Sequence, residues 1–299
     1  MNSTDATYSA ITKLSLTLEL TIGTAAVCLT GLCLAGYLKL HRWKNPSALI
    51  VMNLLGADLL NGVLSPFHAA LCKEELELAG KQHKELFRLV FFFQSMYLSV
   101  SLCTMILINI SRLIAIVVPF RFPALINRRV VTTCLAGFWA AALTMSLVRR
   151  YVDYSSHYNI FLGVVLAQFS LHLIILGLVV LSLVFLRSYT TSTDVQRRTT
   201  LTLAAVSLAY FLSYGYYMYV KIVWMIPALP ADTSNKWVQL TAVSRLSLTI
   251  AHIFLLLNNL FNGVMFGMQP DIRRAIQHVW VRDYYRSELF SEQQDRKPL

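Results

Sequence analysis

Long apolar stretches separated by short polar breaks run through this chain of 299 residues. The pattern predicts seven helices, near residues 14–40, 47–71, 85–118, 130–148, 159–187, 199–226 and 237–267. Each is long enough to cross a bilayer, whose hydrocarbon core requires about 20 residues of apolar helix. The breaks are too short to contain a soluble domain. We therefore expect residues 1–299 to form one all-α integral membrane domain, a seven-transmembrane-helix bundle.

The pattern changes after Pro270. Ile272, Ile276 and Val279 recur at helical spacing among charged and polar residues. Such a stripe is typical of an amphipathic helix that lies on a membrane surface. We predict this surface helix near residues 270–285, followed by a short C-terminal tail.

Composition agrees with lipid as the main solvent. Hydrophobic residues make up 56% of the chain and charged residues only 14%, against about 25% charged residues in a typical soluble domain. The formal net charge is +11, but the Lys and Arg residues fall in short clusters between the apolar stretches. Such clusters are typical of loops beside lipid headgroups, so we expect no nucleic-acid partner.

The charges beside the first predicted helix indicate its orientation. Lys39, Arg42 and Lys44 follow this helix, whereas only Lys13 precedes it. Because basic residues favour the cytoplasmic side, we expect a multi-pass protein of the plasma membrane with an extracellular N-terminus. Asn2, in the sequence Asn-Ser-Thr, is then a candidate glycosylation site.

Two acids lie inside predicted membrane spans. Asp58 lies in the middle of the second, where a carboxylate costs roughly 2.5–3.5 kcal/mol on insertion scales. Ser101 of the third helix and Asn258 and Asn262 of the seventh offer neutral oxygen atoms, which together with Asp58 suit a sodium ion or a proton. The alternative is hydrogen bonding between helices without an ion. Glu19, nearer the end of the first span, is expected to extend toward the surface.

Four short motifs give the chain a family resemblance. They are NLLGAD at 53–58, SRLIAIVVP at 111–119, the Trp of GFWAAAL at 139 and NGVMF at 262–266. Together they resemble the signature motifs of the rhodopsin-like (class A) G-protein-coupled receptors, of which this chain looks like a divergent or orphan member. The resemblance implies a receptor that transmits an extracellular ligand signal to a heterotrimeric G protein.

The resemblance also assigns roles to individual positions. It implies that the G protein is contacted by Ser111, Arg112, Pro119, Phe120, Arg197 and Arg198. It implies a buried sodium-binding cluster of Asp58, Ser101, Asn258, Asn259 and Asn262. It implies activation-motif positions at Phe211, Gly215, Asn262, Gly263 and Phe266.

Some of these positions depart from the family pattern. Ser111 stands where the family has an acid, and Arg197 and Arg198 stand where an acidic partner would hold Arg112 inward. We therefore predict a weakened resting state with raised basal activity. Gly215 replaces the usual Trp of the sixth helix, which predicts an altered hinge.

Single positions also restrict the ligand. The seventh helix has Leu256 where a retinal-binding Lys would stand, and Gln94 replaces the acid that pairs with amine ligands, so we expect no retinal and no amine. The remaining candidates are aromatic or neutral, which favours a small neutral or lipid-like ligand. The expected ligand contacts are Gln94, Tyr97, Gln168, His172, Met218, Tyr219 and His252.

Other functional classes fit the sequence less well. We expect no enzyme, because the sequence contains no nucleophile–base set, HExxH motif, P-loop or dinucleotide-binding motif. A transporter would be expected to have several deep carboxylates, and only Asp58 is deeply placed. A non-signalling seven-helix protein that acts by pairing with receptors remains the main alternative.

Overall fold

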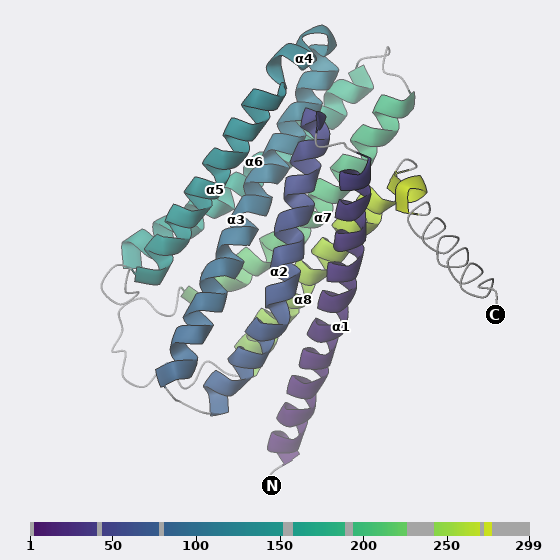
Figure 1. Cartoon of the computed structure of the whole chain (residues 1–299). Helices are drawn as coiled ribbons and strands as arrows, with labels where there is room; N and C mark the ends of the chain where they lie inside the picture. Colours follow the sequence, from purple (N-terminus) through teal and green to yellow (C-terminus); the bar gives the residue numbers. More distant parts are fainter. Residues whose placement is uncertain are drawn as a thin grey trace, which may run out of the picture.

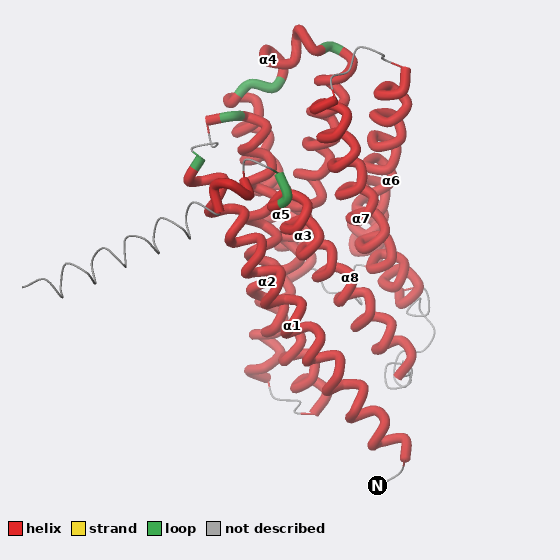
Figure 2. Tube along the Cα trace, turned by 90° about the vertical axis from the view of Figure 1, so that its right-hand side faces the viewer, coloured by secondary structure: helices red, strands yellow, loops and turns green. Residues whose placement is uncertain are grey.

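The structure is a computed structural model. It describes residues 3–40, 44–77, 81–151, 158–188, 194–225, 242–269 and 272–276. These segments are almost entirely helical, and none of them is a strand (Figure 2). Within the described segments, seven helices are long and apolar enough to cross a membrane. The predicted helical architecture with seven candidate spans is therefore confirmed.

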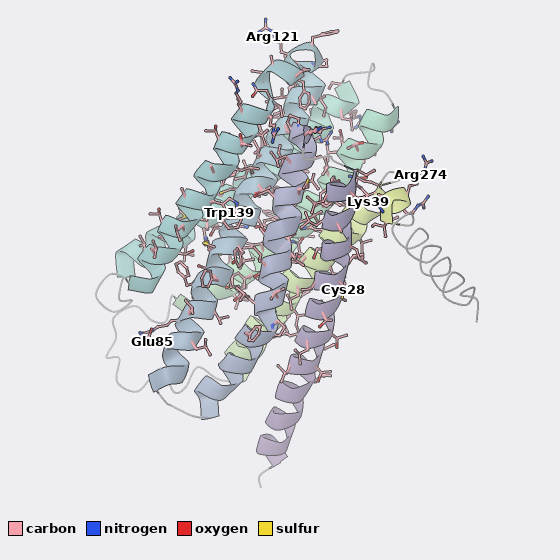
Figure 3. The ribbon with its side chains drawn as sticks, in the orientation of Figure 1. Cys28, Lys39, Glu85, Arg121, Trp139 and Arg274 are labelled. Atoms are coloured by element: carbon pink, nitrogen blue, oxygen red, sulfur yellow. The ribbon has the colours of Figure 1, made fainter. Side chains whose placement is uncertain are left out.

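Successive long helices run in alternating directions (Figure 1). They are α1 (Ser3–Lys39), α2 (Pro46–Glu77), α3 (Lys81–Val117), α5 (Arg128–Tyr151), α6 (Tyr158–Ser188), α7 (Asp194–Met225) and α8 (Ala242–Gly267). Two short elements, η2 (Pro119–Arg121) and α4 (Phe122–Leu125), join α3 to α5 at one end of the bundle. We call this the basic end, because Lys39, Arg121 and Arg274 lie there, whereas Glu85 lies at the opposite, N-terminal end (Figure 3).

Most predicted helix limits agree with the structure to within a few residues, and the exceptions have one cause. α1 begins at Ser3 rather than near residue 14, and α2 continues to Glu77 rather than ending near residue 71. A hydropathy pattern reports where a helix enters the hydrocarbon, whereas a helix continues wherever its backbone hydrogen bonds remain favourable. Polar helical turns beyond the apolar stretch are therefore invisible to the pattern.

Two predicted segments fall partly outside the described residues. The seventh helix was expected from residue 237, and residues 237–241 are not among those described. Of the predicted surface helix at 270–285, only residues 272–276 are described, and these are helical. Their buried side chains, Ile272 and Ala275, lie on the same face of that turn, as the amphipathic pattern requires.

α3 occupies the centre of the bundle. It packs against α2, α5, α6 and α7, while α1 packs between α2 and α8, and α8 also packs on α7. Half of an apolar 18-residue stretch of α3 is buried, as in α2 and α8, compared with 22% in α5 and 28% in α6. The outer faces of α6 carry leucine and valine, including Leu173, Val180 and Val184, as a lipid-facing surface requires.

Small residues bring α8 close to α1. A Cβ atom added at Gly267 would lie 2.9 Å from Cys33 Sγ, and one added at Gly263 would lie 3.1 Å from Leu29 Cγ. Cys33 Sγ also donates a hydrogen bond to the Gly263 carbonyl oxygen at 3.1 Å. Small residues permit this close approach of backbones, which is a common way for membrane helices to associate.

We predict that Gly267→Ala destabilises the protein. The new methyl group would overlap Cys33 Sγ, and overpacking of this kind costs about 1–3 kcal/mol. The thermal unfolding midpoint of the purified protein measures the effect. Gly56→Ala is the matched control, because a Cβ atom at Gly56 meets nothing within 4 Å and Ala favours a helix over Gly by up to ~1 kcal/mol. When Cys33 is also replaced by Ala, Gly267→Ala should no longer lower the unfolding midpoint. An equal loss in that background would contradict this explanation.

Candidate functional site

α3 offers a polar side chain to almost every helix that packs around it. The contacts between side chains are Ser95 with Ser146 of α5 at 3.0 Å, Gln168 of α6 with Ser99 at 3.1 Å, Ser101 with Asp58 of α2 at 2.9 Å, and Asn109 with Ser207 of α7 at 2.8 Å. Each partner is buried. Because hydrocarbon offers no hydrogen bonds, buried polar groups of a membrane protein must find partners in neighbouring helices. α3 therefore acts as the polar spine of the bundle.

The most deeply buried acid among the described residues lies at the centre of this spine. Asp58 is 2% exposed. Its Oδ1 atom accepts a hydrogen bond from Ser101 Oγ at 2.9 Å, and its Oδ2 atom accepts one from Asn262 Nδ2 at 2.8 Å. Asn259 Nδ2 donates to the backbone carbonyl of Asp58 at 3.4 Å. The structure thus brings together residues of α2, α3 and α8 that the sequence analysis had grouped.

Asn262 brings a further buried oxygen atom to this Asp58 cluster, because its Oδ1 atom accepts no hydrogen bond from a described residue. Asn258 Oδ1 is also buried and accepts none, but the described hydrogen bonds do not join Asn258 to Asp58. A carboxylate, a hydroxyl and an amide carbonyl form an oxygen-only set, which suits a hard cation such as Na⁺. The described residues contain no group of three His, Cys, Asp or Glu side chains that could hold a transition metal. The unused oxygen therefore fits the sodium ion implied by the resemblance.

Asn53 extends the polar spine toward α5. Its Nδ2 atom donates to Thr104 Oγ1 of α3 at 2.8 Å, and its Oδ1 atom accepts from Trp139 Nε1 of α5 at 2.9 Å. One amide thereby satisfies groups on two other helices. The sequence analysis recognised Asn53 and Trp139 as parts of separate motifs, but their contact joins three helices.

The expected G-protein contacts lie at the end of α3 and beyond it. Arg112 is half-buried, and its Nε atom donates no hydrogen bond to a described residue. Ser111 Oγ instead donates to the backbone carbonyl of Ile108 at 2.8 Å. Pro119 and Phe120 lie in η2, and Phe120 is 98% exposed.

The other two expected G-protein contacts, Arg197 and Arg198, lie on α7. Arg197 is exposed near the start of that helix, and the side chain of Arg198 lies outside the described part of the chain. Among the described residues, no acid forms an ion pair with Arg112.

The activation-motif positions divide between α8 and α7. Asn262, Gly263 and Phe266 are buried on α8 against its neighbours. Phe211 and Gly215 are only half-buried on α7, and a Cβ atom added at Gly215 would meet nothing within 4 Å. Gly215 therefore leaves open space where the resembled family has a large ring.

Five of the seven expected ligand contacts are buried between helices: Gln94, Gln168, His172, Met218 and His252. The His172 ring stacks on Tyr214 with ring centroids 4.1 Å apart and lies parallel to Tyr210 with centroids 5.8 Å apart. Its Nδ1 atom lies 2.6 Å from the backbone carbonyl oxygen of Gln168. This aromatic stack joins α6 to α7.

The other two expected contacts lie further out. Tyr97 is half-buried and contacts Trp139 edge-on, with ring centroids 6.0 Å apart. Tyr219 is 61% exposed on the outer surface of α7, so the structure does not bring it into this group. Consecutive helical residues point about 100° apart. Because Met218 points inward, its neighbour Tyr219 points outward.

Glu19 was expected to extend toward the surface, and the structure corrects this expectation. It is 5% exposed, and its Oε2 atom lies 3.4 Å from Nδ1 of His252 on α8. The other ring nitrogen of His252, Nε2, lies 2.5 Å from Gln94 Nε2 on α3. The signal in the sequence was an acid and a histidine, each within an apolar stretch, but nothing in the local pattern indicated that α1 and α8 are neighbours.

No protein-family model matches the chain, and no curated protein sequence matches it.

Asn2, the candidate glycosylation site, lies outside the described residues.

Proposed function

We propose that the chain is a receptor of the rhodopsin-like G-protein-coupled family, which transmits an extracellular ligand signal to a heterotrimeric G protein. The observation that carries this proposal is the Asp58 cluster, in which α2, α3 and α8 meet through one carboxylate. Arg112 lies eleven residues beyond Ser101 on α3, about 16 Å further along the helix at 1.5 Å per residue. One continuous helix therefore connects the buried cluster to the basic end.

The distribution of charge supports the proposed orientation in the plasma membrane. The basic end carries Lys39, Arg121 and Arg274 (Figure 3), and Arg128 and Arg129 begin α5 there. Basic residues favour the cytoplasmic side of a membrane, which supports an N-terminus, with Asn2, outside the cell. The G protein then binds at the basic end.

The exposed residues at that end suit a protein partner. Phe120 offers a free aromatic ring beside Arg121, and both follow α3 directly. Aromatic and arginine side chains are the types that most often anchor protein interfaces. Phe120 inserts into the G protein as an apolar anchor, while Arg112 contacts it once the neighbouring helix α7 moves outward.

The proposed ligand is small and neutral or lipid-like, and it binds toward the N-terminal end. Gln94, Gln168 and Met218 supply amide and apolar contacts there, and the ring of His172 supplies an aromatic face. A few hydrogen-bonding groups among apolar walls are typical of sites for such ligands.

We predict that Arg112→Ala abolishes G-protein recruitment, because it removes the only side chain in the SRL sequence that can reach the partner with a charge. The measurement is direct G-protein recruitment in cells, with surface expression confirmed for each variant. Arg128→Ala, which removes an exposed arginine from the start of α5, is the matched control and should keep most of the signal. An unchanged signal in the Arg112 variant would instead favour the non-signalling protein that pairs with receptors.

We predict that Ser111→Asp lowers ligand-independent signalling. The new carboxylate would supply the acid that the resembled family has beside its arginine, and so hold Arg112 inward in the resting state. Ser111→Ala is the control, because it removes only the hydrogen bond to the Ile108 carbonyl and adds no charge. Basal G-protein activation at equal surface expression is the readout. Equal basal activity in the wild type and the Asp variant would contradict the missing-acid explanation.

We predict that sodium stabilises the protein through the Asp58 cluster. A ligand that binds the folded state raises the unfolding midpoint as its concentration increases. The midpoint should therefore be higher in sodium chloride than in choline chloride of equal concentration, and Asp58→Asn should remove the difference while keeping side-chain hydrogen bonds. Ser146→Ala, which removes a buried hydrogen bond between α5 and Ser95 outside the cluster, is the control and should retain the response. A sodium response that survives in the Asp58 variant would place the ion elsewhere.

A further inference from the structure

Glu19, His252 and Gln94 form a second polar cluster, separate from that of Asp58. We call it the three-helix link, because Glu19 lies on α1, His252 on α8 and Gln94 on α3. The carboxylate lies 3.4 Å from one ring nitrogen of His252, and the Gln94 amide lies 2.5 Å from the other. All three side chains are buried. The histidine therefore bridges α1 and α3.

The three-helix link lies close to one face of the membrane. In the sequence, Glu19 lies six residues after Lys13, Gln94 six residues after Arg88, and His252 seven residues after Arg245. Charged residues of this kind mark the polar ends of apolar stretches. At 1.5 Å per residue, the three side chains lie about 9–11 Å along their helices from these charges. Protons from the aqueous phase at the N-terminal end therefore have a short path to the ring.

The charge of the three-helix link depends on one proton. With a neutral imidazole, the Glu19 carboxylate leaves the link with a net charge of −1 in an apolar environment. A protonated ring neutralises that charge and converts the contact into an ion pair. Because an uncompensated charge inside a membrane protein costs several kcal/mol, the two states differ substantially in free energy.

Gln94 suits both states of the histidine. The amide group of Gln94 can donate an N–H to an unprotonated ring nitrogen. After a rotation of about 180° around its terminal side-chain bond, the same amide group presents its carbonyl oxygen as an acceptor to a protonated ring nitrogen. A leucine at this position could form a hydrogen bond in neither state. The amide thus permits the ring to gain or lose a proton without losing its contact with α3.

We propose that Glu19, His252 and Gln94 form a proton-operated link that ties α1 and α8 to α3, so that the protein senses proton concentration on its N-terminal side. Uptake of one proton tightens the link, and its loss loosens the link. This inference does not depend on coupling to a G protein. It concerns the stability of the bundle itself.

Few other described charges face this cluster. On α3, Arg88 and Glu85 pair with each other on the surface at 2.9 Å. On α2, which packs against α1 and α8, the described buried groups toward this end are the neutral Asn61 and Ser65, and Asp58 is held by Ser101 and Asn262. The described buried face of α7 carries tyrosines but no carboxylate, lysine, arginine or histidine.

The link can affect the Asp58 cluster because the two share α8. His252 and Asn262 lie ten residues apart on that helix, about 15 Å at 1.5 Å per residue. A rigid helix transmits a change of position over such a distance. Release of α8 from α3 at the N-terminal end therefore alters how firmly Asn262 holds the Asp58 carboxylate.

The test is the thermal unfolding midpoint of the purified full-length protein in lipid nanodiscs, between about pH 5.5 and pH 8.5, the range in which histidine changes charge. The wild-type midpoint should be highest at the acidic end and should fall by several degrees as the pH rises. The sign follows from charge, because the protonated ring neutralises Glu19 and the neutral ring does not. Glu19→Gln and His252→Gln should each flatten the same part of the curve, and the double variant should flatten it no further.

His172→Gln is the matched control, because His172 is equally buried but belongs to the aromatic stack between α6 and α7. It should retain the wild-type slope whatever its absolute midpoint. A slope that persists in the Glu19 and His252 variants would overturn the proposal. If those variants do not fold, the wild type alone still decides, because a midpoint that does not fall with rising pH is incompatible with the link.

Discussion

A carboxylate inside a bilayer must be held by groups from other helices, and the Asp58 cluster meets this requirement with Ser101 and Asn262. The same requirement repeats along α3, whose polar side chains at different depths each meet a different neighbour. Leucine contacts alone would not fix the relative rotation of helices, because hydrocarbon tails compete equally for apolar faces. The polar contacts therefore determine which face of each helix points inward.

Much of the architecture was predictable because the bilayer imposes a minimum length on every apolar stretch. Asp58 was also recognisable as a buried acid, because it lies in the middle of an apolar stretch. The environment of Glu19 was not predictable, since it depends on α1 lying beside α8, more than 200 residues away in sequence. Tyr219 shows a related limit. Sequence proximity to Met218 grouped the two, but helical rotation separates them.

The two buried acids, Asp58 and Glu19, have different kinds of partner, and each kind suits a different positive charge. Asp58 receives hydrogen bonds from neutral donors and has an unused amide oxygen nearby, an arrangement suited to a cation. Glu19 faces a histidine that can itself carry the positive charge. Both clusters use α8, so whatever displaces that helix changes both together.

The seam between α1 and α8 limits how that displacement can occur. The side chains of Leu29 and Cys33 pack directly onto Gly263 and Gly267, and the side chain of Ile272 packs onto Gly36 just beyond. Two helices packed in this way do not slide gradually along each other, because a shift of less than one turn would bring side chains of α1 against side chains of α8 instead of against its glycines. α8 is thus expected to keep its register or to jump by a whole helical turn, about 5.4 Å, which makes its response to any stimulus stepwise rather than graded.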